Sequence, residues 1–152
     1  MKTILVPLDF SDSSTRVLAK AGEIAKEFSA KLVLLHVVEP VATYVPVGAT
    51  MDVVAAAPPP MDITENIDAY ENRLNALAEP LKTAGVEVES SAIIGLAVDD
   101  ILEQAKKRKA DYILLGSHGH GALFHLFSGS VVTGVLKRAT CPVIVIPARN
   151  ES

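Results

Sequence analysis

The chain has 152 residues, which is the length of one domain of ordinary size. Hydrophobic residues make up 49% and charged residues 21%, a composition that supplies a core and excludes an intrinsically disordered chain. The formal net charge of −4 gives no general attraction to nucleic acid or to an anionic membrane, and we expect binding to neither. A single cysteine, Cys141, excludes an intrachain disulfide and favours a cytoplasmic location.

The first part of the chain predicts two buried strands with a helix between them. Residues 4–6 form a short apolar run that ends at a proline, as a buried parallel strand does, and this run is too short for a signal peptide or a membrane span. Serines in residues 11–14 can cap a helix whose apolar positions recur every three or four residues as far as Phe28. Residues 32–38 show no polar alternation, so we expect helices on both faces of the sheet.

An irregular segment then separates these elements from the next helix. Residues 39–62 are rich in proline and alanine and predict a loop, either a functional lid or a tolerated insertion. Apolar spacing from Ile63 to Leu81 predicts an amphipathic helix, which Pro80 should kink or end. Gly85 suits the left-handed position that follows a helix.

The rest of the chain repeats the alternation of strand and helix. Further elements are expected at residues 86–94, 98–105, 112–115, 131–139 and 143–146. Residues 86–89 alternate between apolar and charged, which predicts a half-exposed strand at a sheet edge. The basic run at residues 106–109 is interpreted as a solvated helix end rather than a nucleic-acid patch.

The order of these elements predicts an α/β fold. Five strands joined by helical crossovers imply a single open five-stranded parallel sheet with helices on both faces. We expect this domain to span residues 1–148, to include the irregular loop at 39–62 and to leave a short tail at 149–152.

Two features of the sequence follow strands of this sheet and could bind a ligand. In an open parallel sheet, ligands bind beyond the carboxyl ends of the strands, where the strand order reverses. Asp9 follows the first strand, and the pattern Gly116-x2-Gly119-x9-Gly129-Ser130 follows the fourth and leads into a helix. Glycines let backbone N–H groups approach a phosphate, and a helix N-terminus favours its negative charge. The pattern therefore predicts a phosphate site, against the simpler interpretation of a glycine-rich turn with a serine cap; it matches neither a Walker A loop nor a dinucleotide fingerprint.

This glycine spacing, together with Asp9, resembles the ATP-binding pattern of the universal stress protein family. The run Cys141-Pro142-Val143-Ile144-Val145 is similar to the closing strand of that family, and the resemblance extends over about residues 2–147. It implies a Rossmann-like fold of the adenine nucleotide alpha hydrolase type, with ATP and Mg²⁺ or Mn²⁺ as cofactors. It also implies a homodimer, or a higher oligomer, through the last strand: Val143, Ile144, Val145 and Ile146.

The resemblance also implies roles for individual positions. Pro7 and Asp9 would line the nucleoside side of the pocket, the Val37 backbone would bind adenine, and the helix start at Ser130 would hold the phosphates. A divalent ion would bridge the phosphates, with the Ser130 hydroxyl as a candidate ligand. No catalytic residue is predicted. The implied ATP-binding residues are Pro7, Leu8, Asp9, Val37, Leu115, Gly116, Ser117, His118, Gly119, Gly129, Ser130 and Val131.

Some positions depart from the family pattern or invite a different interpretation. Ala97 stands where the family often has proline, and His120, Gly121 and His125 replace polar or basic residues, which leaves the contacts of the outer phosphates open. The histidines of this loop are interpreted as phosphate contacts or exposed side chains rather than a zinc or copper site. His36 is interpreted as a core histidine with a satisfied hydrogen bond.

We therefore expect an ATP-binding regulatory module of the stress response, recognised by an unknown client protein and hydrolysing ATP slowly at most. Two alternatives stay open. One is an enzyme that consumes ATP by phosphoryl or adenylyl transfer, which would require a second pocket near Asp9. The other is a binder of another adenine nucleotide, such as AMP or cyclic AMP.

Overall fold

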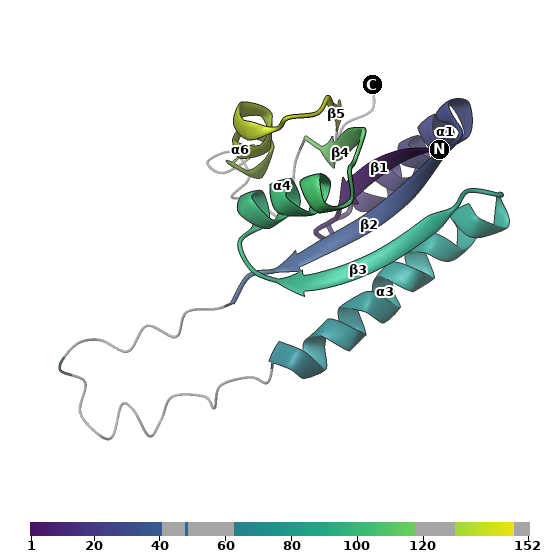
Figure 1. Ribbon diagram of the computed structural model, residues 1–152. Coiled ribbons are helices and arrows are strands. Elements are labelled where there is room, and N and C mark those ends of the chain that lie inside the picture. Colours follow the sequence, from purple (N-terminus) through teal and green to yellow (C-terminus); the bar gives the residue numbers. More distant parts are fainter. Residues whose placement is uncertain (41–47, 49–62, 118–129, 148–152) are drawn as a thin grey trace.

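The computed structural model describes residues 1–40, 48, 63–117 and 130–147 (Figure 1). Most of the irregular loop predicted at residues 39–62 therefore lies outside the described residues. The glycine-rich segment from residue 118 to 129 and the predicted tail at 149–152 lie outside them too.

The described residues form one sheet of five parallel strands in the order β3-β2-β1-β4-β5. The predicted α/β fold is confirmed, and the two strands expected at edges, β3 and β5, are the outermost strands of the described sheet. The strands are β1 (Lys2–Pro7), β2 (Ala30–Val38), β3 (Val88–Ile94), β4 (Tyr112–Gly116) and β5 (Val143–Ile146).

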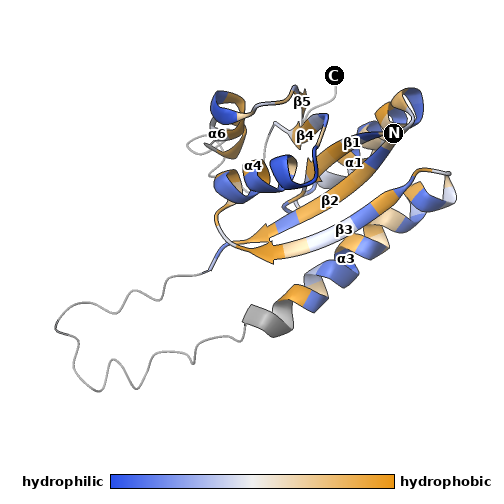
Figure 2. Cartoon of the chain, in the orientation of Figure 1, coloured by the Kyte–Doolittle hydropathy of each residue, from blue (hydrophilic) through white to orange (hydrophobic). Residues whose placement is uncertain are grey.

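Helices cover both faces of the sheet, as the uninterrupted apolar run of β2 predicts. The described helices are α1 (Ser14–Phe28), α3 (Ile63–Thr83), α4 (Ala97–Lys107) and α6 (Ser130–Arg138). Helices α1 and α3 pack on one face around Ile4 and Leu34, whereas α4 and α6 pack on the other around Leu5 and Val33. Figure 2 shows β1 and β2 as mainly hydrophobic strands and the helices as striped, with polar residues turned away from the sheet.

The end of α3 explains why β3 begins later than predicted. The helix continues through Pro80 to Thr83, so the proline does not end it, and Gly85 then adopts the predicted left-handed conformation with φ +86°. The Val86 N–H donates to the Leu81 carbonyl at 3.0 Å, and the Gly85 N–H donates to Lys82 at 2.9 Å. The Val86 N–H therefore caps the C-terminal end of α3, and the strand starts at Val88 instead.

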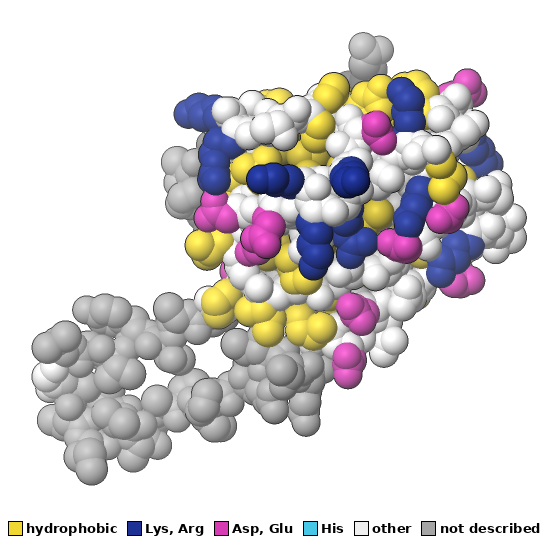
Figure 3. All heavy atoms as spheres, viewed as in Figure 1, with side chains coloured by type: hydrophobic (Ala, Val, Ile, Leu, Met, Phe, Trp, Pro, Cys, Tyr) yellow, Lys and Arg dark blue, Asp and Glu magenta, His cyan; other side chains and the backbone are white. Residues whose placement is uncertain are grey.

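The basic run at residues 106–109 lies at the C-terminal end of α4, as predicted. Arg108 makes an ion pair with Glu89 at 3.0 Å, and Lys31 also pairs with Glu89. The hydrogen bond from Lys31, with the charge of Arg108 nearby, lowers the pKa of Glu89. Figure 3 shows Lys and Arg side chains interspersed with acidic ones on this face, which favours a solvated surface over a nucleic-acid patch.

Helix α4 ends in the same way as α3 but with a lysine at the left-handed position. Lys109 has φ +51°, and the Ala110 N–H donates to the Ala105 carbonyl at 2.8 Å. We expect Lys109→Gly to raise the free energy of unfolding by about 1 kcal/mol, because glycine adopts this conformation without steric cost. Urea denaturation measures the change. The control Lys106→Gly, inside the helix, should lower stability by about 1 kcal/mol, and a shift of both variants in one direction would contradict the argument.

Candidate functional site

The strand order reverses between β1 and β4. The chain runs from β1 outward through β2 to β3, then returns to pair β4 with the other side of β1, where Leu5 lies opposite Ile113. The two strands are parallel, so their carboxyl ends lie at the same edge of the sheet (Figure 1). Strand β1 ends at Pro7 and is followed by Leu8 and Asp9. Strand β4 ends with Leu115 and Gly116 and is followed by Ser117. The fold thus brings these two predicted groups together at the reversal, which is where ligands bind in open parallel sheets.

Asp9 is held in a turn that precedes α1. Its Oδ1 atom accepts a hydrogen bond from the Ser11 N–H at 2.9 Å, and the Ser11 carbonyl accepts the Ser14 N–H at 3.0 Å. The N-cap of α1 is Ser13, whose carbonyl accepts the Val17 N–H at 3.0 Å. Asp9 therefore directs the turn at the end of β1 and does not cap the helix.

An aromatic cluster supports this turn from the side of α3. The Phe10 ring lies 4.6 Å from the His36 ring and 5.9 Å from the Tyr70 ring, measured between centroids, and the Arg73 guanidinium carbon lies 4.1 Å from the Phe10 centroid. His36 makes a hydrogen bond through Nδ1 with the Leu8 carbonyl at 2.7 Å, which confirms it as a satisfied histidine. The sequence pattern did not predict Phe10, Tyr70 and Arg73 as neighbours of the site; the only local signal was an aromatic residue directly after Asp9.

The end of β2, where Val37 was predicted to contact adenine, is tied to the start of α4. The Val38 carbonyl accepts the Gly95 N–H at 3.0 Å, and Glu39 Oε1 accepts the Ala97 N–H at 3.0 Å. A proline at position 97, as in the family pattern, has no N–H to donate. The alanine found here therefore allows a contact between Glu39 and α4 that a proline would remove.

The end of β4 and the start of α6 carry the remaining predicted site residues that the structure describes. Gly116 pairs with Ile146, and the Ser117 N–H donates to the Ile146 carbonyl at 2.8 Å. Val131 is partly buried against the core beneath α4 and α6. Among the predicted site residues, His118, Gly119 and Gly129 lie outside the described residues, and of Ser130 the structure describes the backbone at the start of α6.

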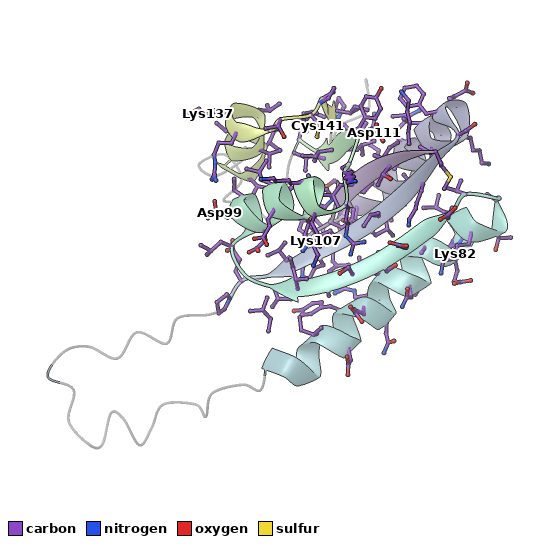
Figure 4. The ribbon with its side chains drawn as sticks, viewed as in Figure 1. Lys82, Asp99, Lys107, Asp111, Lys137 and Cys141 are labelled. Carbon is purple, nitrogen blue, oxygen red and sulfur yellow. The ribbon has the colours of Figure 1, made fainter. Side chains whose placement is uncertain are left out.

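Helices α4 and α6 pack through the apolar cluster beneath them and are also joined by an ion pair at the surface. Arg138 Nη1 lies 2.7 Å from Asp99 Oδ1, which lies near the N-terminal end of α4 (Figure 4).

Cys141 lies in the segment between α6 and β5. Burial raises the pKa of its thiol, and the Asp111 carboxylate acts in the same direction. The thiol is thus kept protonated, which favours a packing role.

Two kinds of site are absent from the part of the chain that the structure describes. No three His, Cys, Asp or Glu side chains within it gather closely enough to hold a metal ion. None of its helices combines the length and the apolar character needed to cross a membrane.

The sequence model that describes the universal stress protein family matches residues 1–147 of this chain. The chain belongs to the universal stress protein family. This universal stress protein is 34% identical to universal stress protein A homolog 2 of Coxiella burnetii, over 99% of its own length and 97% of that of the relative.

Two solved structures extend the comparison. Protein MJ0577 of Methanocaldococcus jannaschii has a TM-score of 0.76 at 24% identity, with 99% of this chain and 98% of that chain covered, a likeness that shows the fold alone. A universal stress protein in complex with cAMP has a TM-score of 0.67 at 26% identity, with 97% of this chain and 98% of that chain covered. The family is thus confirmed for this universal stress protein, and so is its fold, an open sheet of five parallel strands with helices on both faces.

Proposed function

We propose that this universal stress protein binds ATP at the edge of the sheet where β1 meets β4, and acts as a nucleotide-dependent regulatory module in the stress response. The observation that carries the proposal is the position of two predicted groups. The Asp9 turn and Gly116 lie at the carboxyl ends of adjacent strands on either side of the strand reversal. A similar structure that holds cAMP supports an adenine nucleotide as the ligand.

The proposed roles of the residues are those that the family resemblance implies. Pro7 and Asp9 would contact the nucleoside, and the backbone of Val37 at the end of β2 would contact adenine. The N-terminus of α6 at Ser130 and Val131 would hold the phosphates, because its unpaired N–H groups favour negative charge. Mg²⁺ or Mn²⁺ would be held mainly by the phosphates, with the Ser130 hydroxyl as a candidate ligand. Hydrolysis of ATP is expected to be slow at most.

Calorimetric titration of nucleotide-free protein with ATP and magnesium tests this proposal. Gly129→Asp is expected to weaken binding by about a hundredfold or more, because it adds a carboxylate where the pattern predicts phosphate. Thr140→Asp is the matched control: it adds the same charge at an exposed position before β5, at the opposite edge of the sheet, and should change affinity by less than about threefold.

Circular dichroism establishes that both variants are folded before they are compared. Tight binding by the wild type and the control, with loss in Gly129→Asp, supports the site. Absence of binding by the nucleotide-free wild type would refute the proposal and assign the glycine loop a structural role.

A second candidate ligand is a different adenine nucleotide, which the similar cAMP complex favours. Competition titration with AMP and cyclic AMP against ATP distinguishes the cases. Tighter binding of either competitor would replace ATP as the proposed ligand. Steady ATP turnover well above that of the Asp9→Ala variant would instead support an ATP-consuming enzyme.

We also propose a homodimer formed through β5, the edge strand beside β4. Val143, Ile144 and Val145 are only partly buried in the single chain, and an unprotected apolar edge favours pairing with a second strand. A higher oligomer, the client protein that would read the nucleotide state, and a cytoplasmic location remain predictions from the sequence.

Sedimentation velocity tests the dimer with two separate variants, each of which has one lysine at a different edge of the sheet. Val145→Lys on β5 is expected to produce monomers, because two lysines would be brought together at the interface. The matched control Ile94→Lys changes an exposed apolar residue on β3, the opposite edge, and should leave the dimer intact. A dimer that persists in Val145→Lys would exclude this interface.

A further inference from the structure

His36 connects β2 to the turn that carries Asp9. Its Nδ1 atom lies 2.7 Å from the Leu8 carbonyl oxygen, and a carbonyl only accepts, so the imidazole donates. Both the neutral Nδ1–H tautomer and the imidazolium ion make this bond. The Leu8 N–H donates in turn to the Leu35 carbonyl at 2.8 Å, so Leu8 is bound to β2 on both sides.

The residue on the other side of Asp9 also depends on His36. Phe10 has φ +59°, a left-handed conformation that is unfavourable for a bulky side chain. Its ring lies 4.6 Å from the His36 ring and is covered by the Arg73 guanidinium at 4.1 Å. Packing from β2 and α3 therefore holds Phe10 in this conformation.

We infer that His36 is a positioning residue for nucleotide binding, which fixes the direction of the Asp9 carboxylate. Asp9 is the one residue between Leu8 and Phe10, and His36 contacts both of them. Any buried imidazole needs a hydrogen-bond partner, so the bond by itself is compatible with a core role. What favours a positioning role is where the partner lies: His36 bonds to the backbone one residue before Asp9, and its ring packs on the residue after Asp9. The inference rests on the proposed function, in which Asp9 contacts the nucleotide.

Two substitutions separate the hydrogen bond of His36 from its ring. His36→Phe keeps an aromatic ring against Phe10 and removes the donor to Leu8. His36→Asn removes the ring and keeps an N–H donor near the position of Nδ1. We expect His36→Phe to weaken ATP binding on the order of tenfold, because the buried Leu8 carbonyl loses its partner, and His36→Asn to recover part of the loss.

A double-mutant cycle with Asp9→Ala tests whether His36 acts through Asp9. If it does, His36→Phe should cause no further loss of ATP affinity once Asp9 is alanine. A general weakening of the fold would add the same loss in both backgrounds. Full additivity of the two substitutions would overturn the inference.

Hydrogen exchange of the ligand-free protein supplies a readout that does not depend on nucleotide. The Ser11 N–H donates to Asp9 Oδ1, so its exchange should accelerate about tenfold in His36→Phe. The Gly95 N–H, bonded to the Val38 carbonyl, is the reference amide and should be unchanged. If the wild type binds no nucleotide but Ser11 exchange accelerates, the proposed function fails, and what stands is that His36 holds the Asp9 turn. Unchanged exchange at Ser11 overturns the role of His36 whatever the wild type binds.

Discussion

Replacement of Leu5 by alanine is expected to lower the free energy of unfolding by roughly 2–5 kcal/mol. Leu5 lies on β1, the central strand of the sheet, and is fully buried in the core beneath α4 and α6. Truncation removes buried methyl groups and leaves a cavity between packed layers that relax only in part. A domain of this size has a total stability of about 5–15 kcal/mol, so one substitution removes a large share of it.

Urea denaturation measures this loss, and Leu136→Ala is the matched control. Leu136 lies on α6 with 53% of its surface exposed, so the same truncation leaves no internal cavity. Its stability should change by no more than about 0.5 kcal/mol. Equal losses in the two variants would show that burial on β1 is not what makes Leu5 important.

Gly134→Val is expected to disturb both the fold and the candidate site. A Cβ atom at Gly134 on α6 would lie 2.8 Å from Val98 Cγ2 and 3.0 Å from Val98 Cγ1 on α4. Valine is branched at Cβ and has one stiff side-chain torsion, so Val98 has little freedom to move aside. Helix α6 must therefore shift away from α4, at a cost of roughly 1–3 kcal/mol in unfolding free energy.

The same shift moves the N-terminus of α6, where Ser130 and Val131 would hold phosphates. ATP affinity should therefore fall in Gly134→Val at temperatures where the variant is still folded, which calorimetric titration measures. Leu136→Val places a residue branched at Cβ at an exposed position of the same helix and should change neither property appreciably. Adding Val98→Ala to Gly134→Val removes the clashing methyl groups and should restore affinity; failure to do so would contradict the steric explanation.

The architecture could be predicted because the order of apolar and polar residues in each strand indicates whether one or both of its faces are covered. The unbroken apolar run of β2 indicated cover on both faces, and the alternation before Ser90 indicated an edge strand. The start of β3 was predicted two residues too early, at Val86. That side chain is buried, as the pattern says, but its N–H closes α3. The periodicity of apolar residues indicates which way a side chain faces, but it does not indicate which group the backbone N–H of that residue bonds to.

The candidate site was predicted in part, and the missing part has a physical reason. Asp9 and the glycine spacing could be found because each directly follows a strand, and strand order brings their strands together. The contacts among Phe10, His36 and Tyr70 join a turn, a strand and a helix, and no local pattern records them. The prediction of ATP depended on the family resemblance, and the glycine spacing by itself indicated only phosphate.

The pairing of β1 with β4 also determines when the proposed site can form during synthesis. Ile4 lies opposite Tyr112, and the Thr3 N–H donates to the Asp111 carboxylate at 2.8 Å across 108 positions of sequence. During synthesis β1, β2 and β3 leave the ribosome well before β4 does, and domains are made from the N-terminus onward. A nascent chain at that stage carries the Asp9 turn but neither β4 nor α6, so the proposed site is incomplete. On the proposed function, ATP would therefore stabilise the finished domain by mass action and would not help the early steps of its assembly.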